Sequence, residues 1–213
     1  MSSSTWAPTL AITSRSVRRW RVIAFEPVRT NHEYCQANIA LNQLRNVELH
    51  ACALWHVDAT LPLRDHSRGV NASIASDDAV GGEAISVVSL DSVVAGGRLE
   101  LGRLDLRKMN IEGAELSALR GMRSTLKRFR PRIVLQLNPP MLSTFGVTLR
   151  DVWGFFRELG YEIRAFSPWR RPCTGISIQG SAISRSSSSV STRCISVAIR
   201  RSGSSRMSFT NER

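Results

Sequence analysis

The 213-residue sequence lacks the features that mark exported, membrane-spanning or metal-binding proteins. Its four cysteines form no Cys-x-x-Cys pair, and no second pair at ligand spacing accompanies His50 and Cys52, so we expect neither a zinc site nor a disulfide scaffold. No apolar run approaches the ~20 residues that span a bilayer. No basic region precedes the short apolar patch in the first twenty residues. These absences predict a cytoplasmic protein with no membrane partner.

Acidic residues are almost missing from the last part of the sequence. Residues 170–213 contain eight arginines and a single acid, Glu212, and so hold +7 of the net charge of +12. Basic tails can bind phosphates or simply be solvated. Aromatic residues make up only 7% of the chain and are not interleaved with these arginines as stacking platforms. We therefore do not expect nucleic acid as a partner, and binding through the tail is the weakest alternative for the function.

Three zones differ in composition. Residues 1–19 are weakly patterned, residues 20–169 alternate apolar and amphipathic segments, and residues 170–213 are dominated by Ser and Arg. The overall apolar content of 42% suits one compact domain, which we place at 20–169. The tail has little apolar surface to bury and is expected to be disordered, although Cys194 to Ile199 has the composition of a strand.

The middle zone predicts an α/β fold. Its apolar runs predict strands at 21–25, 47–54, 84–88, 104–109, 132–137 and 161–166, and a small hairpin within 61–76. Its periodic segments predict helices at 30–44, at 113–128, and from the Thr148–Asp151 capping box to Gly160. Such alternation indicates a mainly parallel sheet with helices on both faces. Ligands of these sheets sit at the carboxyl ends of the strands.

Glu26 follows directly on a short apolar strand. Pro27 stops that strand, because proline cannot extend a sheet ladder. A carboxylate at this place in a nucleotide-binding sheet can accept hydrogen bonds from both hydroxyls of a ribose. Glu26 could equally cap the following helix, and this stretch alone leaves both interpretations open.

A second acidic group lies in the turn after the strand that ends at Met109. Glu112 and Glu115 stand three residues apart at a helix start and so share one face. Acids there also stabilise a helix start by complementing the positive end of the helix dipole. This second interpretation gives the two acids no catalytic or binding role. Gly113 fits a tight strand-to-helix turn in either case.

Taken in order, five stretches resemble the FkbM-type methyltransferases over about Thr9 to Phe166. They are "VIAFEP", "NIALN", "VSLDSVV", "NIEGAEL" and "RPRIVLQL". The resemblance implies a Rossmann-like, class I fold that uses S-adenosylmethionine. It also implies methyl transfer to a hydroxyl of a small-molecule or sugar acceptor.

The resemblance further implies a role for individual residues. Glu26 would bind the ribose of the cofactor, Asn110 would lie on the cofactor side of the acidic turn, and Cys52, Ala53 and Leu54 would hold the adenine end. Glu112 and Glu115 would orient the acceptor hydroxyl or accept its proton. His56 is a weaker candidate for a general base, because its ordinary pKa is near neutral.

The sequence also departs from the family. There is no glycine before Val22, so the usual first strand and its glycine-rich turn are not found, which would leave two inner strand edges exposed. Asn110, Gln136 and His56 stand where the family commonly has acids. The chain could therefore be an active methyltransferase, or a truncated remnant that binds no cofactor. The acceptor and the oligomeric state are left open.

Overall fold

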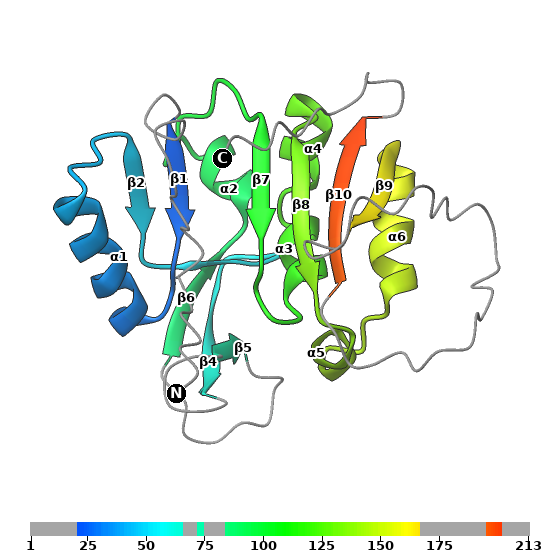
Figure 1. The fold of residues 1–213 in the computed structure, drawn as a ribbon, viewed down its shortest axis with the longest axis horizontal. Coiled ribbons are helices and arrows are strands. Elements are labelled where there is room, and N and C mark those ends of the chain that lie inside the picture. The colour runs from blue at the N-terminus through cyan, green and yellow to red at the C-terminus, as the bar shows by residue number, and fades with distance from the viewer. Residues whose placement is uncertain (1–20, 66–71, 75–83, 167–194, 202–213) are drawn as a thin grey trace.

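The computed structural model describes residues 21–65, 72–74, 84–166 and 195–201, and these form a mixed α/β structure (Figure 1). The strands are β1 (Val22–Phe25), β2 (Val47–His50), β3 (Ala53–Leu54), β4 (Ala59–Asp65), β5 (Ala72–Ile74), β6 (Ala84–Val88), β7 (Leu106–Met109), β8 (Arg132–Leu137), β9 (Tyr161–Phe166) and β10 (Ile195–Arg201). The helices are α1 (Arg29–Leu41), α2 (Leu90–Ala95), α3 (Glu115–Arg120), α4 (Arg123–Phe129), α5 (Pro139–Thr144) and α6 (Leu149–Glu158). Among these described helices none has the length and apolar character needed to cross a membrane.

The described strands form three hydrogen-bonded groups, with the orders β1-β2, β7-β8-β10-β9 and β3-β6-β4-β5. Of the seven described pairs, β1–β2, β7–β8 and β3–β6 are parallel, whereas the other four are antiparallel. The expectation of a mainly parallel sheet is therefore wrong for the described pairs. The antiparallel pairs come from two strands: β10 runs against both β8 and β9, and β4, in the predicted hairpin, runs against both β5 and β6.

Strand β10 comes from the segment that the composition assigned to the tail. It lies between β8 and β9, with Val197 opposite Leu135 on one side and Ala165 on the other. The strand expected at Cys194 to Ile199 is thus present and belongs to the sheet. The rest of 170–213, with its expected disorder, and the zone 1–19 lie outside the described residues.

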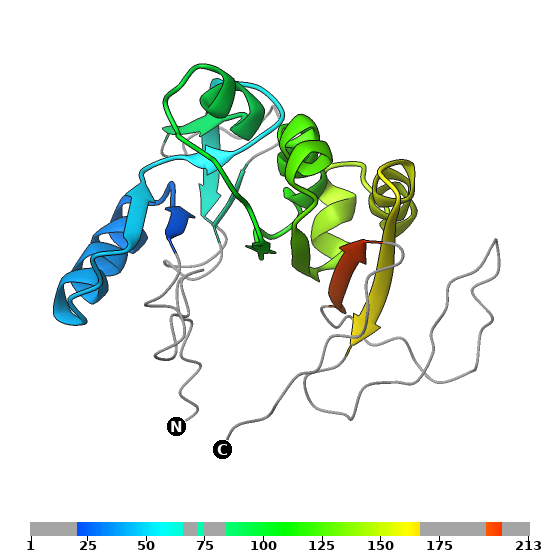
Figure 2. The same ribbon diagram turned by 90° about the horizontal axis from the view of Figure 1, so that it is seen from above.

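Helices α2, α3, α4 and α6 gather on one side of the strands, as Figure 2 shows. Many buried side chains of the main core cluster come from α3, α4 and α6 and from one face of β7 and β8. They include Leu116, Leu119, Met122, Leu126, Met109, Ile133, Leu135, Leu137, Val152 and Phe156. The intervening residues of β7 and β8, such as Leu106 and Val134, are exposed or half-buried. Among the described residues, helices therefore cover only one face of β7 and β8, although we expected them on both.

The helix predicted at 113–128 is divided into α3 and α4. The carbonyl oxygen of Gly121 accepts hydrogen bonds from Asp91 N and from Ser89 Oγ, both at 2.8 Å, and so leaves the helical ladder. The Asp91 carboxylate accepts from Ser124 N at 2.7 Å and from Thr125 N at 2.8 Å, and thereby begins a new helix. Ser89 and Asp91, at the start of α2, thus provide the hydrogen-bond partners that the backbone would otherwise find within a continuous helix.

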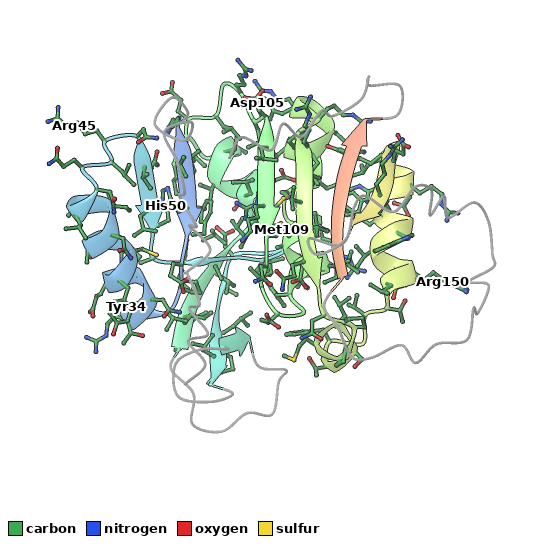
Figure 3. All side chains as sticks on the ribbon, viewed as in Figure 1. Tyr34, Arg45, His50, Asp105, Met109 and Arg150 are labelled. Atoms are coloured by element: carbon green, nitrogen blue, oxygen red, sulfur yellow. The ribbon has the colours of Figure 1, made fainter. Side chains whose placement is uncertain are left out.

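Helix α1 does not bury the face on which Tyr34, Ala37 and Leu41 lie at helical spacing. Tyr34, Ala37 and Leu41 are exposed, and Tyr34 lies on the outer side of the helix (Figure 3), whereas Cys35 is buried. The helix begins at Arg29 after Val28, without a side-chain cap, so Thr30 and Asn31 lie inside the helix and do not cap it. Periodicity locates an apolar face, but the layer opposite the helix decides which face is buried.

The later elements follow the sequence closely. The capping box is present: Thr148 N donates to Asp151 Oδ2 at 2.7 Å, and Asp151 N donates to Thr148 Oγ1 at 3.3 Å. Gly160 has a φ of 66°, the left-handed conformation expected at the end of this helix. Helix α5, by contrast, lies where no element was predicted. It begins with two prolines, which suit the first turn of a helix because no intrahelical N–H is needed there.

Candidate functional site

Strands β1, β7 and β8 run in the same direction, so their carboxyl ends point to the same side of the structure (Figure 1). Glu26, Asn110 and Asn138 are the first residues after these three strands. Parallel α/β arrangements bind ligands at this edge, where the strands end and the chain turns away. The candidate site is therefore built on three strand ends that are far apart in the sequence.

Glu26 continues the pairing of β1 with β2, since its N donates to His50 O at 3.0 Å. Its Oε1 accepts a hydrogen bond from Val28 N at 3.1 Å, which shapes the entry into α1. Burial raises the pKa of this carboxyl above its ordinary 4.5, although Val28 N, the Asn31 side chain and His32 partly offset the effect. The half-buried carboxylate is thus incompletely solvated, and further hydrogen-bond donors from a ligand would stabilise its charge.

Glu115 holds the acidic turn together from within. Its side chain is fully buried, Oε1 accepts from Ile111 N at 3.1 Å, and Oε2 accepts from Gly113 N at 2.9 Å. Burial raises the pKa of Glu115, and these backbone donors and the charge of Glu112 modify that shift in opposite directions. Because both oxygens are occupied by its own turn, this geometry gives Glu115 a structural task and does not support its expected contact with an acceptor.

Glu112 is the acid of this turn that is not enclosed. It is half-buried with a φ of 49°, and its Oε2 accepts a hydrogen bond from Asn138 Nδ2 at 3.3 Å. Gly113 has a φ of 101°, and a Cβ there would collide with the carbonyl group of Met141. The turn after β7 is therefore pressed against α5, and the contact with Asn138 joins the ends of β7 and β8.

His56 does not join these acids. It is exposed, its Cα lies against Gly121, and among the described residues no hydrogen bond links it to Glu112 or Glu115. The neighbouring Trp55 is buried instead, with its ring 6.0 Å from that of Phe145 in an edge-on contact. The role of His56 as a general base has no geometric support here.

The three residues expected at the adenine end differ in accessibility. Cys52 and Ala53 are half-buried, whereas Leu54 is only 5% exposed and packs in the main core. Burial raises the pKa of the Cys52 thiol, so the thiol is uncharged at neutral pH. Cys52 and Ala53 can contribute accessible surface, but Leu54 can act only through packing. In the described part of the chain, no cluster of His, Cys, Asp and Glu could hold a metal ion.

Two residues near this edge were not singled out from the sequence. Asn138 follows β8 directly, so the rule that led to Glu26 would also have found it. Trp55 belongs to a second core cluster that includes Ala114 of the acidic turn and against which Val28, at the entry to α1, packs. It gave no signal, because a buried tryptophan has the same sequence pattern whether it supports a site or only a core.

The fold of the described residues agrees with comparisons against known proteins. A family model described as the methyltransferase FkbM domain matches residues 3–163. The chain is also similar to the crystal structure of methyltransferase FkbM from Methylobacillus flagellatus KT, with a TM-score of 0.53 and 18% sequence identity. That similarity covers 84% of this chain but only 36% of the other, so this chain spans about a third of that protein. A comparison with curated proteins found no match. The family match covers most of the sequence, and the chain belongs to the FkbM methyltransferase domain family.

Proposed function

We propose that the protein is an S-adenosylmethionine-dependent methyltransferase that acts on a hydroxyl group of a small-molecule or sugar acceptor. The observation that supports this proposal is the position of Glu26 and of the Glu112–Asn138 pair just after the carboxyl ends of β1, β7 and β8. The Glu26 carboxylate suits the ribose of the cofactor, and the Glu112–Asn138 pair suits the hydroxyl group of the acceptor. The family membership supports the same reaction class.

The residues present fit part of the cofactor. Glu26 offers a carboxylate that gains from additional donors, as the two ribose hydroxyls would be. Cys52 and Ala53 would border the adenine end, and Asn110, half-buried after β7, would lie toward the middle of the cofactor. Within the described ranges no glycine-rich turn lies beside β1, so these residues provide no cradle for the methionine end. When bound, S-adenosylmethionine supplies a methyl group that its sulfonium already activates.

The acceptor side has a simple task. The protein must hold a hydroxyl group in line with the methyl group and take up its proton. Glu112 can accept a hydrogen bond from that hydroxyl, while Asn138 fixes the carboxylate from the neighbouring strand end. Asn110 and Gln136 are neutral where the family commonly has acids. Glu112 is therefore the residue to which we assign the proton.

The test is a calorimetric titration of the 213-residue protein with S-adenosylhomocysteine. We expect saturable binding that Glu26→Ala abolishes and that the matched variant of an exposed acid on α1, Glu33→Ala, preserves. Glu112→Gln should keep this binding and lose methyl transfer to a panel of sugars and small alcohols. No heat from a folded wild-type sample would favour the alternative of an inactive relative. Unchanged binding by Glu26→Ala would refute the ribose assignment.

A further inference from the structure

The second core cluster takes residues from each segment of the chain that carries a candidate site residue. These segments are the entry to α1, strand β3, the acidic turn after β7 and the end of α5. They contribute Val28, Ala53, Ile111, Ala114 and Phe145. Trp55 has the largest side chain of the cluster and is only 9% exposed. The cofactor side and the acceptor side of the candidate site therefore rest on one packed cluster.

The backbone of Trp55 is held by its neighbours. Its N donates to Val88 O at 2.8 Å, which continues the pairing of β3 with β6. Its carbonyl group lies directly against Gly121, where a Cβ would collide with it. Asp58 fixes the end of the same short loop, because its Oδ1 accepts from Ser89 N at 2.8 Å. The backbone that carries the Trp55 ring is therefore fixed from several sides.

The ring of Trp55 contacts the acceptor side directly. The Phe145 ring lies 6.0 Å away, centre to centre, in an edge-on contact. Phe145 ends α5, and its side chain also lies beside Gly113 of the acidic turn. Helix α5 begins after Asn138, which donates to the Glu112 carboxylate. The contact between the two rings thus reaches both segments that hold Glu112 in place.

Trp55 also follows directly on the three residues assigned to the adenine end. Of these, Cys52 and Ala53 are half-buried, and Ala53 packs against the second core cluster. With adenine bound there, the end of β3 and the backbone of Trp55 would be restricted together. A packed unit that one ligand has already made rigid costs less to order at a neighbouring site.

We propose that Trp55 is a positioning residue through which cofactor binding stabilises the acidic turn and presents Glu112 to the acceptor. This inference rests on the proposed function and adds an order to it, in which the cofactor binds before the acceptor. Because such coupling is reciprocal, the acceptor tightens cofactor binding by the same factor. Trp55 itself touches neither reactant. A tryptophan that only filled the core would stabilise the fold without linking the two sides.

The test measures hydrogen exchange in the 213-residue chain with and without S-adenosylhomocysteine. The amides of Ile111 and Gly113 report on the acidic turn, since both donate to the Glu115 carboxylate. In the wild type we expect S-adenosylhomocysteine to slow their exchange about tenfold. Trp55→Leu should bind S-adenosylhomocysteine with a Kd within about threefold of the wild type, measured by calorimetry, but should lose this slowing.

Three further variants separate positioning from simple packing. Trp153→Leu is the matched control, because Trp153 is a half-buried tryptophan of α6 that packs against the main core. It should lose stability in urea and keep the slowing. Trp55→Phe retains an aromatic ring opposite Phe145 and should restore most of the slowing. Phe145→Leu should lose the slowing as Trp55→Leu does, and it decides the question if Trp55→Leu does not fold.

The outcomes distinguish this inference from the proposed function. Slowing that persists in folded Trp55→Leu or Phe145→Leu would overturn the role of Trp55. Binding of S-adenosylhomocysteine by the wild type with no slowing at Ile111 and Gly113 would also overturn it, while the proposed function would stand. No binding by a folded wild-type sample would remove both.

Discussion

Glu115 shows how one buried side chain can fix the shape of the acidic turn after β7. A glutamine there keeps one acceptor oxygen but places an NH2 group opposite a backbone N–H that now lacks its partner. We expect Glu115→Gln to lower the free energy of unfolding by about 1–3 kcal/mol, even though removing a buried charge offsets part of the loss. Urea denaturation measures this, with the exposed Glu33→Gln as control. Equal stability of the two variants would show that the turn does not depend on these bonds.

Glu26 should behave in the opposite way, because ionisation of its half-buried carboxyl lowers the stability of the folded protein. Burial raises its pKa above 4.5, so the folded protein binds the proton more tightly than the unfolded chain does. The stability that this carboxyl contributes is therefore greatest below about pH 4.5 and falls as the pH rises through the folded pKa. We expect Glu26→Gln to gain stability relative to the wild type between pH 4 and pH 7 in urea unfolding. A constant difference across this range would contradict the raised pKa.

At the scale of elements, Asp91 connects α2 to α4. Its carboxylate accepts three hydrogen bonds, from Ser124 N, Thr125 N and Thr125 Oγ1, at 2.7–2.8 Å. We expect Asp91→Ala to cost about 2–3 kcal/mol in the free energy of unfolding, because the first turn of α4 loses its cap. Asp105→Ala is the matched control, since it removes only an exposed ion pair with Arg103. Similar losses in the free energy of unfolding in both variants would show that the Asp91 carboxylate does not cap α4.

The segment that forms α3 and α4 shows where sequence reasoning succeeded and where it did not. The four apolar residues that recur at helical spacing in this segment are all buried, because such spacing shows which face meets the core. They are Leu116, Leu119, Met122 and Leu126. The break at Gly121 could not be predicted, because its cause is Ser89 and Asp91, about thirty residues away in the sequence. Local patterns carry no information about such distant partners.

The candidate site also has features that could be predicted from the sequence and features that could not. The position of Glu26 at a strand end could be predicted, because it follows from chain order alone. The different tasks of Glu112 and Glu115 could not, because they depend on which carboxylate folds back onto its own turn. His56 lies in the right stretch of sequence, but the chain after β3 carries it toward Gly121 and away from contact with the acids.

At the scale of the whole molecule, β10 joins segments that would otherwise share no ladder. Ala198 is opposite Val134 of β8 and Arg164 of β9. Ala198→Pro removes a backbone N–H from a strand with neighbours on both sides, where proline is not tolerated. We expect a loss of at least about 1–3 kcal/mol, measured by thermal and urea unfolding. Ala198→Ser keeps the N–H and is the control; unaltered stability of the proline variant would show that β10 is dispensable.

The position of β10 also sets the order in which the protein can fold. Ile195 pairs with Leu137, and Ser196 pairs with Phe166, so both ladders close long loops. During synthesis, β8 and β9 leave the ribosome well before the strand that lies between them, and they cannot pair with each other in the final register. Sheets with such distant pairings fold slowly and expose strand edges while they wait. The half of the sheet that carries Asn138 should therefore form last, and the nascent chain should depend on chaperones until residue 201 has emerged.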